Sequence, residues 1–509
     1  MKRLLLAALL LAPSSALHAV DAAKPAKPNI LIVLADDLGY GDVQCCNPQR
    51  GKIRTPNIDR LAAQGMRFTD GHSSSGVCSP SRYTLLTGRY HWRTRLQTGI
   101  VKVWGEPLIA PDRLTVAGFA RQHGYRTAAI GKWHLGWDWP KAGGKPVFDR
   151  AIANGPTTRG FDTYFGTDVP NWPPYCFIEN DRTVGIPGEM LPPEKLKNHQ
   201  ASLQGPALPD WKLEAILPTL GDRACAFLSD AAKQSEPFLL YLPLTAPHTP
   251  LAVNNDWKGR SGLIPYADFV METDAVIGRV LDAMEKSGAA SNTLVLFTSD
   301  NGCAPYIGAK EMEAKGHFPS GPLRGYKGDA WEGGHRVPFI VRWPGVVRAA
   351  SECSQLVHHA DLIATVAEIL GDKLPANAGE DSYSLLPLLK GVDKPVRDHA
   401  VSCAMSGQPA LRRGPWKLIA AANGGGGFNK GGRVQPPTKV LLYNLDEDLG
   451  ETRNLAGERP ELVAEMQALL EKLIRDGRST PGEPQKNDVE VRRWPQPKTT
   501  ATKVEEVKK

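Results

Sequence analysis

Lys27-Pro-Asn-Ile-Leu-Ile-Val-Leu34 is an apolar run that ends at Ala35-Asp36-Asp37. It shows no polar alternation and is entered by Pro28, which predicts a central strand of a parallel sheet, buried on both faces. Shorter runs of the same kind, and amphipathic helical segments between them, follow along the chain. We therefore predict an α/β fold with a mostly parallel central sheet covered by helices. The expected strands are Thr127–Ile130, Phe238–Leu244 and Thr293–Thr298, and the expected helices are Thr55–Ala63, Leu114–Gln122, Gly221–Lys233 and Tyr266–Lys286.

The texture of the chain changes after about residue 395. Trp416–Ala420 and Val440–Leu445 are typical of strands in a small sheet, and Pro460–Asp476 has the apolar spacing of an amphipathic helix. From Thr480 the chain is polar, Pro-bearing and charged, which is typical of a mobile tail. We expect a large domain over residues 20–395, a small α+β domain over 396–479 and a mobile tail over 480–509.

Composition narrows the class of protein. The 509 residues are 41% apolar and 23% charged, as in soluble globular proteins. The net charge of +7 is mild for this length, and without a focused basic stretch we expect no nucleic-acid partner. The eight cysteines are scattered without a Cys-x-x-Cys pair, which disfavours a zinc ribbon.

The N-terminal segment has the pattern of a targeting signal. Lys2 and Arg3 precede the apolar run Leu4–Leu11, and small residues follow to Ala19. This pattern predicts a secretory signal peptide over residues 1–19. The run is too short to span a bilayer, and no later stretch approaches eighteen apolar residues. We expect an exported protein, periplasmic or secreted, without a membrane span.

Cys78-Ser-Pro-Ser-Arg-Tyr-Thr-Leu-Leu-Thr-Gly88 carries the most specific local signal. Pro80 suits the first turn of a helix, where its missing N–H costs nothing. The i, i+4 spacing places Cys78 and Arg82 on one face. That face lies at the positive end of the helix dipole, which favours anions. A buried cysteine in a proline-capped helix is the alternative interpretation.

Acidic residues follow two of the predicted strands. Asp36 and Asp37 end the first, and Asp300 and Asn301 end Thr293–Thr298. Sites in parallel sheets lie beyond the carboxyl ends of strands, so these side chains can meet. Three carboxylates and an amide oxygen form a set of oxygen ligands, which suits calcium, or magnesium as second choice, and not zinc. Ordinary turn or N-cap chemistry remains the alternative for each cluster.

Cationic and imidazole side chains occur in three further places. Lys132 and His134 follow a predicted strand two residues apart, a spacing that faces one side. His248 lies between Pro247 and Pro250 after another strand, where its backbone freedom is restricted. Lys327 lies in the glycine-rich string Gly325–Gly328, where backbone can approach a ligand closely. Together these groups could bind an anion, although each alone is also typical of a surface loop.

The string from Cys78 to Arg82 resembles the maturation signature Cys-x-Pro-x-Arg of type I sulfatases, in which a maturation enzyme oxidises the cysteine to formylglycine. Gly124–His134 resembles the second signature of this family. Thr245–His248 and Lys327-Gly328 resemble the family's remaining catalytic motifs and follow in the same order along the chain. The resemblance covers roughly residues 28 to 455 and is strongest to arylsulfatases and N-acetylgalactosamine-6-sulfatases. It implies an alkaline-phosphatase-like sandwich with a mixed, mostly parallel sheet, a formylglycine-generating maturation enzyme as partner, and hydrolysis of sulfate monoesters.

The resemblance also implies roles for single residues. Arg82 would hold the formylglycine and the charges near the metal, and His248 would protonate the leaving alcohol. His134 would assist release from the aldehyde hydrate, which is the nucleophile. Lys132 and Lys327 would bind sulfate oxygens, while Asp36, Asp37, Asp300, Asn301 and modified Cys78 would bind calcium. A serine of the family has no match after Gly160–Gly166, and Asp168 or Asn171 stands there.

Two other functions remain open at this stage. A phosphodiesterase or phosphonate monoester hydrolase of the same superfamily could use a similar site. A non-catalytic glycan-binding relative would not need the nucleophile. Aromatic residues near the predicted loops suit stacking on sugar rings, which favours a sulfated saccharide over a small sulfated molecule, although they could equally be core residues. These aromatic residues are Trp133, Trp137, Trp139, Trp172 and Tyr175.

Overall fold

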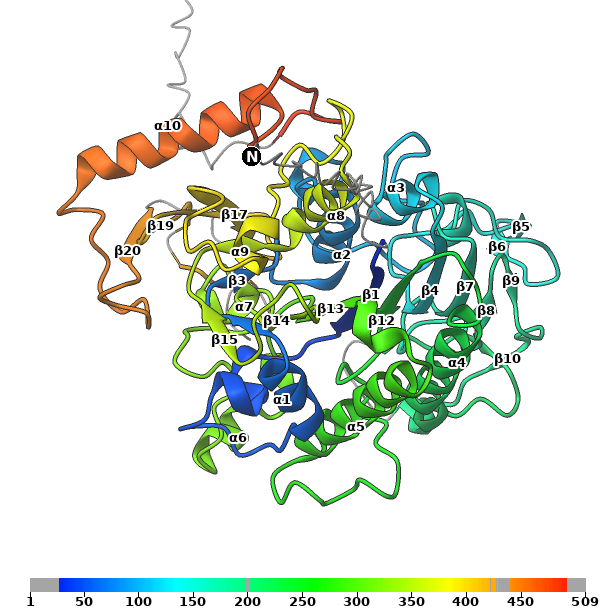
Figure 1. The fold of residues 1–509 in the computed structure, drawn as a ribbon. Coiled ribbons are helices and arrows are strands. Elements are labelled where there is room, and N and C mark those ends of the chain that lie inside the picture. Colours follow the sequence, from blue (N-terminus) through cyan, green and yellow to red (C-terminus); the bar gives the residue numbers. More distant parts are fainter. Residues whose placement is uncertain (1–26, 197–201, 422, 427, 429–439, 492–509) are drawn as a thin grey trace, which may run out of the picture.

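The computed structural model describes residues 27–196, 202–421, 423–426, 428 and 440–491 (Figure 1). The expected signal peptide at 1–19 lies outside this part. Within it, ten strands form the central sheet. In spatial order they are β15 (Ser351–Cys353), β2 (Met66–Phe68), β14 (Phe339–Arg342), β13 (Thr293–Ser299), β1 (Asn29–Ala35), β12 (Phe238–Pro243), β4 (Arg126–Lys132), β7 (Thr163–Thr167), β8 (Ile178–Glu179) and β9 (Arg182–Thr183).

The middle of this sheet is parallel. Strand β1 pairs in parallel with β12 and β13, and β4 and β7 extend the parallel array. Antiparallel pairs occur towards both edges, at β13–β14–β2 and β7–β8–β9. The prediction of a mixed, mostly parallel sheet is confirmed.

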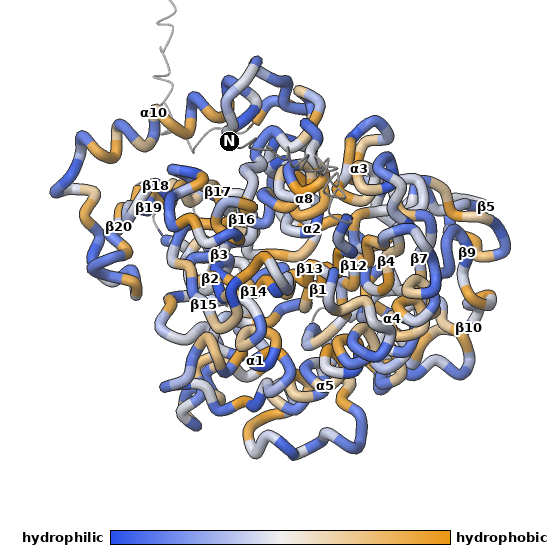
Figure 2. Tube along the Cα trace, viewed as in Figure 1, coloured by the Kyte–Doolittle hydropathy of each residue, from blue (hydrophilic) through white to orange (hydrophobic). Residues whose placement is uncertain are grey.

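Both faces of the sheet are covered, which explains the unbroken apolar run of β1. Ile30 and Ile32 join the core on one face, while Leu31 and Val33 join the core on the other. Figure 2 shows the central strands as a hydrophobic band between helices of mixed colour. The helices of the first face are α2 (Cys78–Thr87), α3 (Val116–Gln122), α8 (Leu362–Leu370) and α9 (Leu386–Leu389), and those of the second are α1 (Pro56–Ala63), α4 (Ile216–Ala231) and α5 (Pro265–Lys286).

Two short helices and three short strand pairs lie around this core. The helices are α6 (Ala309–Ala314) and α7 (Glu332–His335), and the strand pairs are β3 (Gly71–His72) with β16 (Val357–His358), β5 (Lys141–Ala142) with β6 (Lys145–Pro146), and β10 (Glu189–Met190) with β11 (Pro206–Ala207).

A small antiparallel sheet forms the C-terminal part, as predicted. Its strands alternate strictly: Leu411 and Leu418 face α10, whereas Ala410 and Ile419 face the large domain near Trp331. This period of two buries both faces. The elements are β17 (His399–Cys403), β18 (Pro409–Arg413), β19 (Trp416–Ile419), β20 (Leu441–Asn444) and α10 (Pro460–Asp476).

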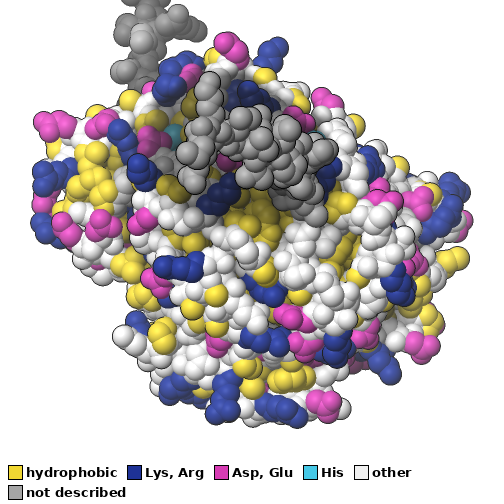
Figure 3. Space-filling view, viewed as in Figure 1, with side chains coloured by type: hydrophobic (Ala, Val, Ile, Leu, Met, Phe, Trp, Pro, Cys, Tyr) yellow, Lys and Arg dark blue, Asp and Glu magenta, His cyan; other side chains and the backbone are white. Residues whose placement is uncertain are grey.

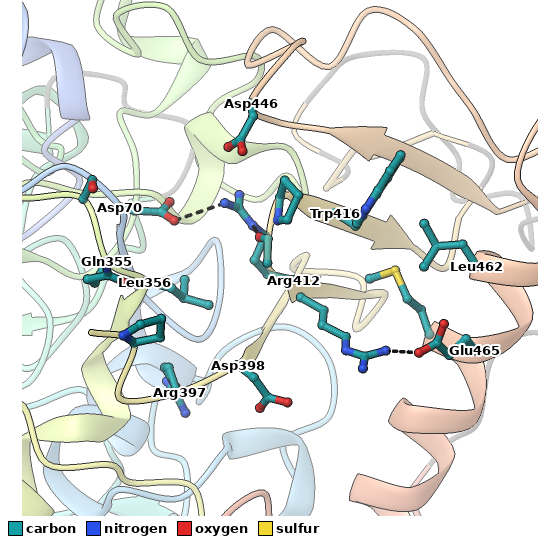
Figure 4. A pocket seen from close by; sticks show the side chains of 16 residues that line it. Asp70, Gln355, Leu356, Arg397, Asp398, Arg412, Trp416, Asp446, Leu462 and Glu465 are labelled. Atoms are coloured by element: carbon teal, nitrogen blue, oxygen red, sulfur yellow. Dashed lines mark hydrogen bonds and ion pairs between the residues drawn. The ribbon is translucent and has the colours of Figure 1, made fainter. Parts of the chain in front are cut away.

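A cavity of about 660 Å³ lies between this small sheet, α10 and the large domain (Figure 4). Arg412 reaches Asp70 of the large domain at 3.2 Å, and Arg413 pairs with Glu465 of α10. These ion pairs join the walls of the cavity, which none of the predicted site residues lines.

Two expectations differ from the structure. Helix α4 begins at Ile216 rather than Gly221, because Pro218 falls in its first turn and is tolerated there. The expected mobile tail is held through residue 491, since Arg89 bonds Lys486 O at 2.9 Å and Asp488 N–H donates to Arg93 O at 2.8 Å. Residues 492–509 lie outside the described part.

Basic and acidic side chains are intermixed over the face drawn in Figure 3. Among the described residues, no helix is both long and apolar enough to cross a membrane.

Candidate functional site

The centre of the site forms where two neighbouring parallel strands end. Ala35 of β1 pairs with Ser299 of β13, so Asp36 and Asp300 come directly after paired residues. Asp300 Oδ1 accepts the backbone N–H of Asp37 at 3.1 Å. Asp37 adopts a left-handed φ of 65°, which turns the chain immediately after the strand. All three carboxylates are buried, and the expectation that the two acidic strand ends meet agrees with this geometry.

Asn301 completes the oxygen set. Its Nδ2 donates to Asp37 Oδ1 at 2.8 Å, while its buried Oδ1 has no hydrogen-bond partner among the described residues. Ligand atoms of Asp36, Asp37, Cys78 and His248 all lie within 4.8 Å of one another. An amide oxygen without a donor beside three carboxylates fits a hard cation such as calcium or magnesium. The donor set of this chain therefore fits the metal that the sequence predicts.

Cys78 and Arg82 lie on the first turns of α2, beside these carboxylates. Arg82 binds Asp300 Oδ2 through Nε at 3.0 Å and Nη2 at 2.8 Å, and reaches Asp36 Oδ1 at 3.3 Å. Burial raises the pKa of the Cys78 thiol to about 12, although Lys132 and Lys327 act in the opposite direction. The unmodified thiol therefore stays protonated and would be a poor nucleophile.

Two lysines approach the carboxylates from other loops. Lys132 Nζ lies 2.7 and 3.0 Å from the two oxygens of Asp36, and Lys327 Nζ lies 2.6 Å from Asp37 Oδ2. Burial raises the pKa of Asp36, but Lys132, with His248 and Arg82, outweighs it and holds that pKa well below its usual range. The site thus balances three carboxylates against three cations.

His134 is held by contacts that fix its tautomer. It has a left-handed φ of 53°, and its backbone N–H donates to Asp168 Oδ1 at 3.2 Å. Nε2 lies 3.1 Å from the carbonyl of Val101, so Nε2 carries the proton and Nδ1 is left as an acceptor. Burial, Lys132 and Arg82 lower the pKa of His134 well below its usual range. The ring is therefore neutral, as a proton acceptor must be.

His248 faces the same centre from the loop after β12. Its Nδ1 donates to Thr249 O at 2.6 Å, and Nε2 lies 3.6 Å from Asp37 Oδ2. Burial lowers the pKa of His248 to about 4, against the charge of Asp37. All the catalytic and metal residues that the sequence predicts are thus brought to one place.

The aromatic residues are mostly not part of this place. Trp133, Trp137, Trp139 and Tyr175 are at most 6% exposed and pack in the two main cores, so of the two interpretations that the sequence left open, the structure supports core residues for these four. Trp172 alone is half-buried, with its ring 5.4 Å from that of His134.

Some contributors had no signal in the sequence. Val101 acts through a carbonyl, and Asp168 supports His134 from 34 residues away. Tyr306 and Phe428 lie beside Lys327, with 5.6 Å between their rings. Of these residues, the sequence pointed only to Asp168, as one of two residues at the position of the family's serine and not as a partner of His134.

Comparison with known proteins defines the class. The Sulfatase family model matches residues 28–372, and the chain belongs to this family. It is accordingly a sulfuric ester hydrolase with an alkaline-phosphatase-like fold, which confirms the predicted family, fold class and enzyme class.

Several individual sulfatases are similar to this chain over most of its length. N-acetylgalactosamine-6-O-sulfatase of Bacteroides thetaiotaomicron is 33% identical over 88% of this chain and 93% of its own length. Human arylsulfatase A is 33% identical over 90% of each chain. A solved Bacteroides thetaiotaomicron 6S-sulf structure, from work on the metabolism of multiple glycosaminoglycans, has a TM-score of 0.78 at 31% identity and covers 88% and 99% of the two chains. Ps i-CgsB in complex with k-i-k-neocarrahexaose has a TM-score of 0.67 at 26% identity, with 90% and 95% covered.

Proposed function

We propose that this enzyme hydrolyses sulfate monoesters of a saccharide, using a formylglycine made from Cys78 and a bound calcium ion. One observation carries the proposal. Cys78 is the first residue of α2, with its sulfur grouped with Asp36, Asp37 and His248. A modified residue there lies among groups that bind a cation and next to two lysines that suit a sulfate.

The formylglycine hydrate would supply the nucleophilic oxygen, and the calcium ion would add positive charge for the sulfate oxygens. Asp36, Asp37, Asp300 and Asn301 would hold the ion. With three carboxylates already balanced by Arg82, Lys132 and Lys327, a divalent cation makes the centre net positive, which favours an anionic ester.

The lysines and histidines of the site would bind the sulfate and transfer protons. Lys132 and Lys327 are buried ammonium groups that would bind sulfate oxygens while keeping their carboxylate partners. His134 presents an unprotonated Nδ1 and would take a proton from the nucleophile residue. His248 would deliver a proton to the leaving oxygen from Nε2 of its protonated ring, in which Nδ1 still donates to Thr249 O, and the negative charge of a bound sulfate ester would raise its pKa from the low value that burial sets.

Asn171 is the better candidate for the remaining sulfate contact. Asp168 Oδ1 already accepts the His134 N–H and the indole N–H of Trp137 at 3.1 Å. Burial raises the pKa of Asp168 to about 6, so at neutral pH it still carries charge that repels a sulfate. Asn171 is neutral, buried and close in sequence.

A saccharide substrate is supported by the relatives, since one acts on N-acetylgalactosamine 6-O-sulfate by its name and another is bound to a neocarrahexaose. Export is supported by the N-terminal pattern, and a formylglycine-generating enzyme of the same compartment would be the maturation partner.

The test compares ester classes on one preparation. Enzyme co-expressed with a maturation enzyme is assayed on sulfated monosaccharides and on matched phosphate monoesters, phosphodiesters and phosphonate monoesters. We expect the highest kcat/KM on a sulfated sugar. A higher value on phosphodiesters or phosphonates would favour the alternative hydrolase of the same superfamily.

A further inference from the structure

The loop between β19 and β20 of the small sheet lies against the loop that carries Lys327. Ala330 N–H donates to Gly424 O at 2.7 Å, and Gly426 N–H donates to Asp329 Oδ1 at 2.7 Å. We call residues Gly424–Gly426 the glycine strap. These two bonds, one to a backbone carbonyl of the strap and one from the strap to the Asp329 carboxylate, fix the strap beside Lys327.

Glycine is required at both ends of this strap. A Cβ on Gly426 would lie 1.6 Å from Gly328 O, and one on Gly424 would lie 2.2 Å from the Trp331 ring. Gly425 differs, because the nearest atom to its Cβ would be Asn423 Oδ1 at 3.4 Å. The two anchoring glycines let the strap touch the catalytic loop, and the middle one has room to spare.

The strap leads to Phe428, whose ring lies over the site. Lys327 Nζ is 5.9 Å from the Phe428 ring centroid, within the range of a cation–π contact. The Tyr306 ring lies 5.6 Å away at 57°, and Gly328 lies directly beneath Phe428. Phe428 and Tyr306 are both half-buried, so each keeps some surface for a ligand.

We propose that Phe428 is a specificity-determining residue, which packs against the sugar ring of the substrate while Lys327 binds its sulfate. The inference rests on the proposed function. Phe428 lies in the loop between β19 and β20, beyond residues 28–372 that the family model matches. The proposal therefore gives the C-terminal sheet a part in substrate choice.

Physical reasons favour a sugar ring over other leaving groups. A pyranose has a face of C–H groups that matches the flat, apolar surface of an aromatic ring, and its polar edge stays free to meet water. The ring of Phe428 brings no hydrogen-bonding group, so it would add affinity without competing for the sulfate. Its effect should therefore fall on KM rather than on kcat.

The experiment measures kcat and KM for N-acetylgalactosamine 6-sulfate in five forms: wild type, Phe428→Leu, Phe428→Tyr, Gly426→Ala and Gly425→Ala. We expect Phe428→Leu to raise KM about tenfold, the upper part of the range for aromatic stacking, with kcat within about threefold. Phe428→Tyr should retain the wild-type KM. Gly426→Ala should raise KM as Phe428→Leu does by displacing the strap, while Gly425→Ala is the silent control. Melting temperatures of all five check folding.

A second measurement keeps this inference separate from the proposed function. In a Cys78→Ala background, which binds but does not turn over, the affinities for N-acetylgalactosamine 6-sulfate and for inorganic sulfate are titrated. Adding Phe428→Leu should weaken binding of the sugar sulfate about tenfold and of inorganic sulfate less than threefold. Equal affinities and equal KM with and without the Phe428 ring would overturn the inference. Absence of turnover on any sulfate ester would instead overturn the proposed function, and the titration would still judge Phe428.

Discussion

Replacing Lys417 with methionine should destabilise the enzyme by an amount that depends on pH. Lys417 is 1% exposed on β19, and its Nζ lies 2.8 Å from Glu332 Oε1 and 2.8 Å from Glu451 Oε1. It is the group that joins a carboxylate of α7 to one that follows the small sheet. Methionine fills the space of the lysine but leaves two buried carboxylates facing each other. Arg336 at 3.3 Å and the rings of His335 and His72 at 3.8 and 3.9 Å remain as partners of Glu332.

The magnitude follows from the burial of these charges. Removing one partner of a buried ion pair typically costs about 3–5 kcal/mol, because the other charge stays desolvated. At roughly 1 °C for each kcal/mol in a chain of this size, Lys417→Met should lower the melting temperature by about 3–5 °C at pH 8. Exposed Lys472, which pairs with Asp476 one helical turn away, is the matched control, and Lys472→Met should change stability by less than about 0.5 kcal/mol.

The sign of the pH dependence is set by Glu451. Burial raises the pKa of Glu451 to about 7, against the pull of Lys417, and losing Lys417 would raise it further. A carboxyl group whose folded pKa is raised binds more protons in the folded state, so its penalty is present at high pH and fades as the pH falls toward its ordinary value. At pH 5 the variant should be only about 1–2 kcal/mol less stable than wild type, the loss of a hydrogen bond.

The assay is calorimetry of both variants and wild type at pH 5 and pH 8, at one scan rate. Equal melting temperatures for Lys417→Met and Lys472→Met at pH 8 would show that the buried contact carries no net stability. A deficit that is the same at both pH values would show that Glu451 does not take up the proton.

The remaining predictions concern the site. Cys78→Ser should lose at least 100-fold in kcat with an unchanged melting temperature, and mass spectrometry of wild type should find an aldehyde or its hydrate in the peptide that contains residue 78; full activity with an intact thiol would exclude this nucleophile. Asp300→Ala should lose bound calcium and turnover together, and stoichiometric zinc in active wild type would contradict the ligand set. His248→Ala should lose roughly 100- to 10,000-fold on sugar sulfates and much less on esters of acidic phenols, which need little protonation. His134→Ala should lower kcat on both substrates alike, and a difference between them would assign it to the leaving group instead.

The central sheet could be predicted from the sequence because its strands are buried on both faces. The apolar runs of β1, β12 and β13 have no other stable environment, and the acidic residues that follow β1 and β13 mark the edge where parallel strands place a site. The short antiparallel strands at the edges of the sheet, such as β2 and β8, have two or three residues and no such pattern. They pair because the sheet is already there, so their signal is tertiary rather than local.

The walls of the site were not predictable for the same reason. Trp133, Trp137 and Trp139 follow a strand that ends at Lys132, a position that fits a binding surface as well as a core, and the structure packs them in the core. Nothing in the sequence indicated that Phe428 lies beside Lys327, because the two residues are 101 positions apart. The contact depends on Gly424 and Gly426, where any side chain would clash with the loop of Lys327. Sequence patterns report which residues avoid water, and not which of two distant segments will cover them.

The short segment from Lys327 to Arg336 is held in place by contacts with the C-terminal sheet and its β19–β20 loop. It carries Lys327 at one end and α7 at the other, and residues 328–331 between them form no helix or strand. Two contacts hold this segment: Gly426 N–H of the glycine strap donates to the Asp329 carboxylate, and Lys417 of β19 forms an ion pair with Glu332. Lys327 Nζ lies 2.6 Å from Asp37 Oδ2, and displacement of its loop by even an ångström would break this hydrogen bond. The central sheet and α2 thus position Asp36, Asp300, Arg82 and Lys132, whereas the C-terminal sheet and its β19–β20 loop hold the loop of Lys327.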